Sequence, residues 1–139
     1  MTARTAVYGA LANDQDPEYL DLIGRSNPRV FAKKSMTSSI ESTPYIVYKM
    51  GNSSAEGLSE DRDPERQFFQ VWVHDFHDGK NADYMRIDRV ITHVKRILEK
   101  INGQGIWTVT FLETSQDLND ETLNTVFRYL RFQMIKEGE

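Results

Sequence analysis

The sequence predicts an α+β fold, in which a mainly antiparallel β-sheet is packed by one long central helix and a short N-terminal helix. Two adjacent stretches carry this prediction. Residues 67–74 alternate between two faces, with Phe69, Val71 and Val73 on one of them, and this period of two is typical of a β-strand. Residues 82–101 repeat apolar side chains every three or four positions, which indicates an amphipathic helix. We therefore expect this helix to bury its apolar stripe against a sheet that contains the strand.

Two short helical segments are expected before the sheet. Residues 3–12 gather their apolar side chains on one side, as a short helix does. Asp16-Pro17-Glu18 then begins a second segment, because Asp is favoured at the N-cap, Pro at the first helical position and an acid in the first turn. Gly24 ends it. The pair predicts a helical hairpin, or one broken helix, that covers the sheet.

A connector over residues 25–43 leads to the first long strand. Within it, residues 29–32 are a possible short strand, and a turn-promoting Pro44 introduces a strand over 45–50. Residues 51–66 are polar and charged, so we interpret them as a long loop between two antiparallel strands. Such a loop is either solvated or a contact for a partner. Its charged candidates for a contact are Glu60, Asp61, Arg62, Asp63, Glu65 and Arg66.

The central helix has recognisable ends. Asn81 is a candidate N-cap, and Asp83 in the first turn suits the positive end of the helix dipole. At the other end, Asn102-Gly103 is a stop signal because both residues tolerate the left-handed conformation.

Two segments remain after the helix. Residues 106–113 predict a strand, and residues 114–121 predict a polar turn. Residues 123–135 match both a helix and a strand that is buried on two sides, and periodicity does not separate the two. We prefer the strand, because pairing it back onto residues 106–113 makes a hairpin.

Composition limits the classes of function. The chain has 139 residues, which predicts one domain over 1–139, and it has no cysteine, so disulfides and thiolate metal sites are excluded. The net charge of −4 disfavours binding of nucleic acid through its phosphates. We expect a soluble protein without a membrane span.

One cluster of His and Asp side chains is a candidate for metal binding or for acid–base catalysis. His74, Asp75, His77 and Asp78 fall within five residues, and such side chains can ligate a metal ion or act as a general base. A full ligand set is not evident, since the third histidine, His93, lies inside the helix. We therefore interpret the cluster as ordinary polarity at a strand end and turn, and we expect no enzyme activity, no metal and no cofactor.

The order of segments resembles the small tail-completion or tail-terminator proteins of long-tailed bacteriophages, over about residues 1–136. A "TPYIVYKM" strand precedes "RQFFQVWVHDFHDGKNADYMRIDRVITHVKRIL", in which a strand leads directly into an amphipathic helix, and "DLNDETLN" precedes a last aromatic-rich strand. The matching residues are Pro44, Tyr45, Val47, Tyr48, Phe69, Val71, Trp72, Val73, Asp117, Asp120 and Thr122.

This resemblance implies a structural virion protein located in the tail or neck and assembled in the cytoplasm of the host bacterium. Its implied partners are further copies of itself in a hexameric ring, the tail tube protein that the ring caps, and the head–tail connector or head-closure protein. DNA would pass through the lumen without specific binding, and no membrane is involved. Trp72 and Trp107 lie in predicted strands, where we interpret them as core or interface anchors. Trp72 joins the charged loop residues as a candidate contact.

Three alternatives stay open. The first is another neck component, such as a head-closure or connector protein. The second is a small metal-dependent enzyme that uses His74, His77 and Asp78. The third is a soluble adaptor that binds one partner through the 51–66 loop.

Overall fold

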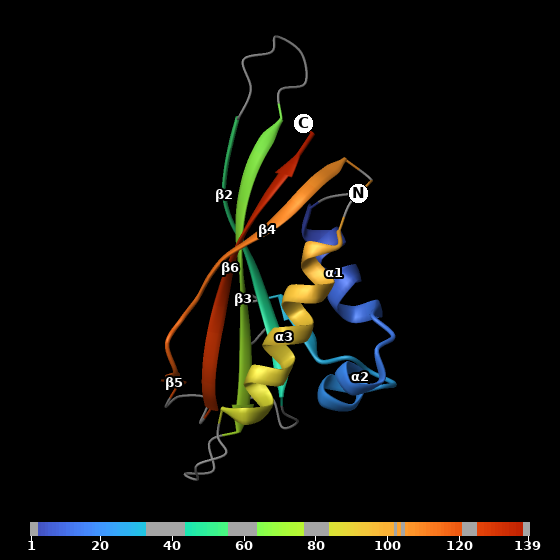
Figure 1. Cartoon of the computed structure of the whole chain (residues 1–139), viewed down its shortest axis with the longest axis vertical. Coiled ribbons are helices and arrows are strands. Elements are labelled where there is room, and N and C mark those ends of the chain that lie inside the picture. The colour runs from blue at the N-terminus through green and yellow to red at the C-terminus, as the bar shows by residue number, and fades with distance from the viewer. Residues whose placement is uncertain are drawn as a thin grey trace.

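The computed structural model describes residues 3–32, 44–55, 64–76, 84–101, 103, 105–120 and 125–137. In these residues three helices lie against one face of a six-stranded sheet (Figure 1). The elements are α1 (Ala3–Asn13), α2 (Pro17–Ile23), β1 (Val30–Ala32), β2 (Tyr45–Ala55), β3 (Glu65–Phe76), α3 (Met85–Glu99), β4 (Ile106–Thr114), β5 (Leu118–Asp120) and β6 (Thr125–Lys136). The predicted α+β class, with a mainly antiparallel sheet, is confirmed.

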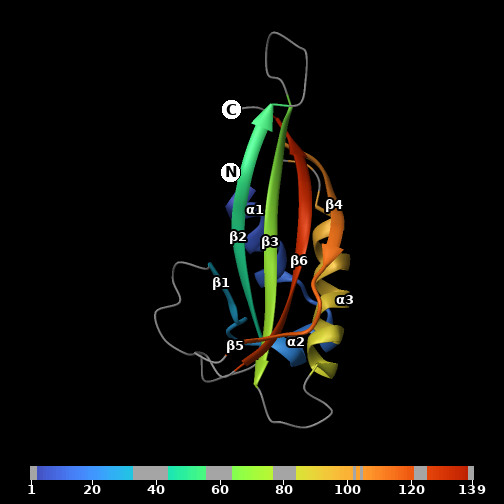
Figure 2. The same cartoon turned by 90° about the vertical axis from the view of Figure 1, so that its left-hand side faces the viewer.

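The sheet has the strand order β1-β2-β3-β6-β4, and β5 also pairs with β6. Among the described strands, only β1 and β2 run parallel, and their other pairings are antiparallel. β6 lies between β3 and β4, which is visible where the sheet is seen face on (Figure 2). The described part of the ambiguous segment, residues 125–135, is therefore a strand that pairs with the predicted strand 106–113, and it also pairs with β3 along the whole length of that strand.

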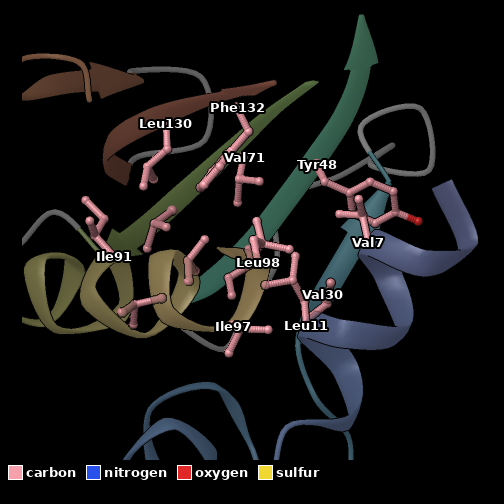
Figure 3. Close-up of a cluster of buried hydrophobic side chains, with 14 of the residues drawn as sticks. Val7, Leu11, Val30, Tyr48, Val71, Ile91, Ile97, Leu98, Leu130 and Phe132 are labelled. Atoms are coloured by element: carbon pink, nitrogen blue, oxygen red, sulfur yellow. The ribbon is translucent and has the colours of Figure 1, made fainter. Parts of the chain in front are cut away.

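The core lies between the sheet and the helices. Phe69, Val71 and Val73 point from β3 to the helices, as their alternation predicts, and all three are buried. Figure 3 shows side chains from α1, α3 and the strands β1, β2, β3 and β6 meeting in this layer. The buried stripe of α3 is Ile87, Val90, Ile91, Val94, Ile97 and Leu98.

The residues that the sequence predicts at the two ends of α2 act as expected. An oxygen of the Asp16 side chain accepts hydrogen bonds from the backbone N–H groups of Glu18, at 3.0 Å, and Tyr19, at 3.2 Å. Pro17 occupies the first helical position. Gly24 closes the helix with φ of +112°, and its N–H donates to the Leu20 carbonyl at 2.8 Å.

The predicted loop over 51–66 is too long. β2 continues to Ala55, and β3 begins at Glu65, so residues at both ends of that segment are strand. A β-bulge between Met50 and Ser53 lets the pairing resume after the register shifts. Gly51 suits this bulge, because a Cβ there would lie only 3.1 Å from the Phe68 carbonyl oxygen. Residues 56–63 of the predicted loop lie outside the described residues.

Two further boundaries differ from the prediction. α3 begins at Met85, and its N-cap is Tyr84, which makes no capping hydrogen bond through its side chain. Asn81, the predicted cap, lies outside the described residues. The predicted polar turn 114–121 contains the short strand β5, because β6 continues past the end of β4 and offers that edge to Leu118–Asp120.

Candidate interaction surface

The face of the sheet opposite the helices carries rows of side chains that cross the strands, and no described helix covers it (Figure 2). The first row is aromatic. Tyr45 packs edge-on to Phe31 and stacks on His74, with 4.9 Å between the latter two ring centroids and 5° between their planes. His74 stacks in turn on Phe127, at 4.9 Å. Burial raises the pKa of the Tyr45 phenol to about 12, so this ring stays neutral at physiological pH.

The structure gives His74 and Asp75 packing and hydrogen-bond partners. His74 is buried, and its Nδ1 lies 2.9 Å from the Thr125 hydroxyl. The buried Asp75 carboxylate accepts two hydrogen bonds from Arg86 of α3, at 2.6 and 2.9 Å. The described residues contain no group of three or more metal-ligating side chains. His77 and Asp78 lie outside them, so a metal site there stays a prediction.

The second row contains Trp72, one of the predicted contact residues. Trp72 is half-buried in β3 between Val47 of β2 and Tyr129 of β6. Its ring centroid lies 6.2 Å from that of Tyr129, with the planes tilted by 46°. Trp72 therefore belongs to the face that the helices leave uncovered.

The third row is charged and borders a hollow of about 390 Å³. Lys49, Gln70 and Arg131 face one another across β2, β3 and β6. Arg131 donates through Nη1 to Glu113 of β4 at 2.8 Å, whereas the exposed Lys49 has no ion pair among the described residues. Two cations therefore flank the hollow, and Lys49 has no acidic partner in the part of the chain that the structure describes.

The edge strand β4 presents two large apolar side chains to solvent. Trp107 is 54% exposed and Leu112 is 41% exposed, and each lies at a register shift in the pairing of β4 with β6. The sequence indicated Trp107 as a core or interface anchor, but it gave no reason to single out Leu112. A bulge changes which face a side chain occupies, and the period of two does not reveal where the bulge lies.

The charged candidates are only partly described. Glu65 accepts a hydrogen bond from the Ser53 hydroxyl at 3.0 Å and lies 3.7 Å from the Lys136 ammonium group. Arg66 is a β3 residue that pairs with Ser54 and Ile135. Trp72 lies six residues further along β3, about 20 Å away, so the structure does not bring it together with them. Glu60, Asp61, Arg62 and Asp63 lie outside the described residues.

A separate ionic cluster joins α2 to α3. Arg96 donates to both oxygens of Asp14, at 2.8 and 3.3 Å, and this hydrogen bonding holds the pKa of Asp14 below its ordinary value. His93 lies beside the cluster, with its Nε2 3.4 Å from Glu18 and its ring next to Tyr19. His93 lies inside α3, as the sequence predicts.

Comparisons with known proteins place the fold. No family model and no curated protein match the sequence. Among the solved structures that do match is a chain of "Virion of native gene transfer agent (GTA) particle", with a TM-score of 0.69 and 16% sequence identity. The alignment covers 98% of this chain and 95% of that chain. The two chains therefore share a fold over almost their whole lengths. None of the described helices is long and apolar enough to cross a membrane.

Proposed function

We propose that this chain is a structural virion protein, a tail terminator that forms a hexameric ring, caps the tail tube and joins it to the head connector. The observation that carries the proposal is the fold shared, almost end to end in both chains, with a chain of a gene transfer agent virion. The segment order that resembles tail terminators supports the specific role and the number of copies.

The surfaces of the chain suit assembly into a ring. Rings form when one surface of a subunit contacts a different surface of the next and the rotation closes. β4 is an edge strand that carries the exposed Trp107 and Leu112, and exposed apolar side chains on a strand edge favour a partner that covers them. The uncovered face of the sheet provides a second, different surface.

The remaining contacts follow from this role. The neighbours of the ring would be the tail tube protein on one side and the connector or head-closure protein on the other. The charged residues from Glu60 to Arg66, together with Trp72, stay the proposed contacts within the assembly. DNA would pass through the lumen, where a net charge of −4 on each subunit disfavours adhesion.

Solution mass tests the proposal. We expect light scattering after size exclusion to give the mass of six subunits over a range of concentrations, and negative-stain images to show rings with six-fold symmetry. Purified tail tubes mixed with the protein should then stop growing and carry a ring at one end. A protein that stays monomeric and leaves growing tubes uncapped would contradict the proposal. Binding to the connector without capping of tubes would favour another neck component.

A further inference from the structure

The hollow on the uncovered face combines cations with hydrogen-bond donors. Its wall includes Lys49 and Asn52 of β2, Phe68 and Gln70 of β3, and Arg131 of β6. We call this site the basic hollow, and we define it by Lys49, Gly51, Asn52, Phe68, Gln70 and Arg131.

The charges of the basic hollow are incompletely neutralised. Arg131 uses Nη1 for Glu113, and its side chain is 42% exposed, so further N–H donors are available for another acceptor. Lys49 contributes an exposed ammonium group without an ion pair among the described residues. A carboxylate is the ligand that meets an ammonium, a guanidinium and the amide N–H groups of Gln70 and Asn52 together.

The chain itself contains a complementary segment. Residues 56–63 carry the four carboxylates of Glu56, Glu60, Asp61 and Asp63 and one guanidinium, that of Arg62, so this segment accounts for −3 of the net charge of −4. It joins the paired ends of β2 and β3, where Ala55 lies opposite Glu65.

The distance along the strand favours a neighbouring copy as the source of these acids. The nine residues 56–64 between these ends span at most about 32 Å, so a connection that goes out and back reaches about 16 Å from its ends. Six residues of strand separate Ala55 from Lys49, which is about 20 Å. Asn52, three residues from Ala55, is within reach of acids of the same chain, but Lys49 is at the limit of that reach. A second copy can bring its acids to both ends of the hollow.

We propose that the basic hollow binds the acidic segment 56–63 of a neighbouring copy. This inference rests on the proposed ring and identifies one of its head-to-tail contacts, because the segment and the hollow are different surfaces of the subunit. The cations of the hollow would meet carboxylates of the segment, and this complementarity would fix how one subunit is positioned on the next.

Charge exchange between two variants tests this contact. Lys49→Glu and the double variant Glu60→Lys/Asp61→Lys should each lower the association constant of the subunits at least about tenfold, because like charges then face each other. An equimolar mixture of the two variants should recover rings, since each reversed hollow accepts a reversed segment and each native hollow accepts a native one. Arg89→Glu, an equal change of charge on the exposed face of α3, is the matched control and should assemble normally.

The outcomes separate the two proposals. Rings that form equally well in both variants would overturn the contact and leave the tail-terminator proposal standing. A second outcome would also overturn the contact between neighbours. If rings recover when the reversed hollow and the reversed segment lie in one chain, but not when the two variants are mixed, the acids bind the hollow of their own subunit.

A peptide assay decides the contact if the wild-type protein stays monomeric, which would count against the ring. A synthetic peptide of residues 56–63 should shift the backbone amide signals of Gly51 and Gln70 in nuclear magnetic resonance spectra of the wild-type protein but not of Lys49→Glu. Raising the salt from about 0.1 to about 0.5 M should weaken this binding, because exposed charges are screened. The absence of shifts, or shifts with a short DNA duplex and none with the peptide, would overturn the inference.

Discussion

Asp75 shows how a single buried charge constrains this protein. Its carboxylate accepts two hydrogen bonds from Arg86, whose side chain is half exposed, and one from the backbone N–H of Phe76 at 2.7 Å. Removing the arginine would therefore leave a charge without its partner inside the protein, whereas removing the carboxylate would leave a guanidinium that water can solvate.

We expect Arg86→Met to lower the free energy of unfolding by about 3 kcal/mol and Asp75→Asn by about 1 kcal/mol, for this reason. Urea denaturation followed by circular dichroism measures both values. Arg25→Met breaks an exposed ion pair with Asp21 and is the control, with an expected loss below about 0.5 kcal/mol. Equal losses for the two variants of the buried pair would contradict the asymmetry.

Asp14 makes stability depend on pH in a defined direction. Hydrogen bonds from Arg96 lower the pKa of Asp14 in the folded protein, so the unfolded chain takes up this proton first as the pH falls. The contribution is fully present above the ordinary pKa of 3.8, and it is lost as the pH falls through the lower folded value.

We therefore expect wild type to be more stable than Asp14→Asn at pH 6, and this difference to shrink between about pH 4.5 and 3. Parallel urea titrations of the two proteins across this range measure it. A difference that stays constant with pH would show that Asp14 contributes no pH-dependent stability.

Residue types with strict local rules could be predicted from the sequence. Asp16 and Gly24 act where the sequence places them, because capping depends on neighbours within a few positions. The exposure of Leu112 could not be predicted, since it depends on a bulge that forms only against β6.

At the scale of elements, Gly24 sets the end of α2. Its φ of +112° is unfavourable for a residue with a Cβ, and a Cβ there would lie 3.0 Å from both the Asn27 carbonyl oxygen and the Arg29 guanidinium. Gly103 also has a positive φ, +83°, but nothing lies within 4 Å of its Cβ position.

We expect Gly24→Ala to cost about 2 to 3 kcal/mol and Gly103→Ala about 1 kcal/mol, because only the first adds a steric conflict to the backbone strain. Thermal unfolding of both variants gives the comparison. Equal shifts of the melting temperature would show that the crowding at Gly24 is relieved by movement of the loop.

Elements with a clear period were predicted, and extensions without a local signal were not. α3 and β3 follow from their repeats, although β3 is longer at both ends than predicted. The continuation of β2 past Met50 and the short strand β5 depend on hydrogen bonds to a neighbouring strand and were not predicted. For β6 the period left helix and strand open, and the expected hairpin with residues 106–113 led to the correct choice of a strand. A neighbour far away in sequence leaves no local signal.

At the scale of the whole molecule, a substitution at the exposed edge of β4 should affect assembly of the subunits but not the stability of each subunit. Leu112 is largely outside the core, so Leu112→Lys should change the free energy of unfolding by less than about 0.5 kcal/mol. If β4 lies at a subunit contact, the same change should shift the protein from rings towards monomers, because it places a charge on an apolar surface.

Light scattering and urea denaturation on the same samples measure the two effects. Met85→Lys, which alters an exposed apolar residue at the start of α3, is the control and should leave both unchanged. Normal ring formation by Leu112→Lys would remove β4 from the proposed contacts.

The grouping of residues on the candidate surface could not be predicted from the sequence. Lys49, Gln70 and Arg131 come from three strands, and they meet only because β6 lies beside β3. The sequence drew attention instead to the contiguous charges from Glu60 to Arg66. It marked an acidic segment as a candidate contact, but it could not show which surface has the complementary charge.

The position of β6 has a consequence for how the protein is made. β3 and β4 both pair with β6 and not with each other, so the middle of the sheet is vacant until residues 125–136 have been synthesised. Before that point, in a nascent chain that contains the helices and β1 to β4, β3 and β4 lack their common partner strand and the apolar layer stays exposed. Final folding therefore follows translation of residue 136, and chaperones would have their main opportunity to bind before that moment.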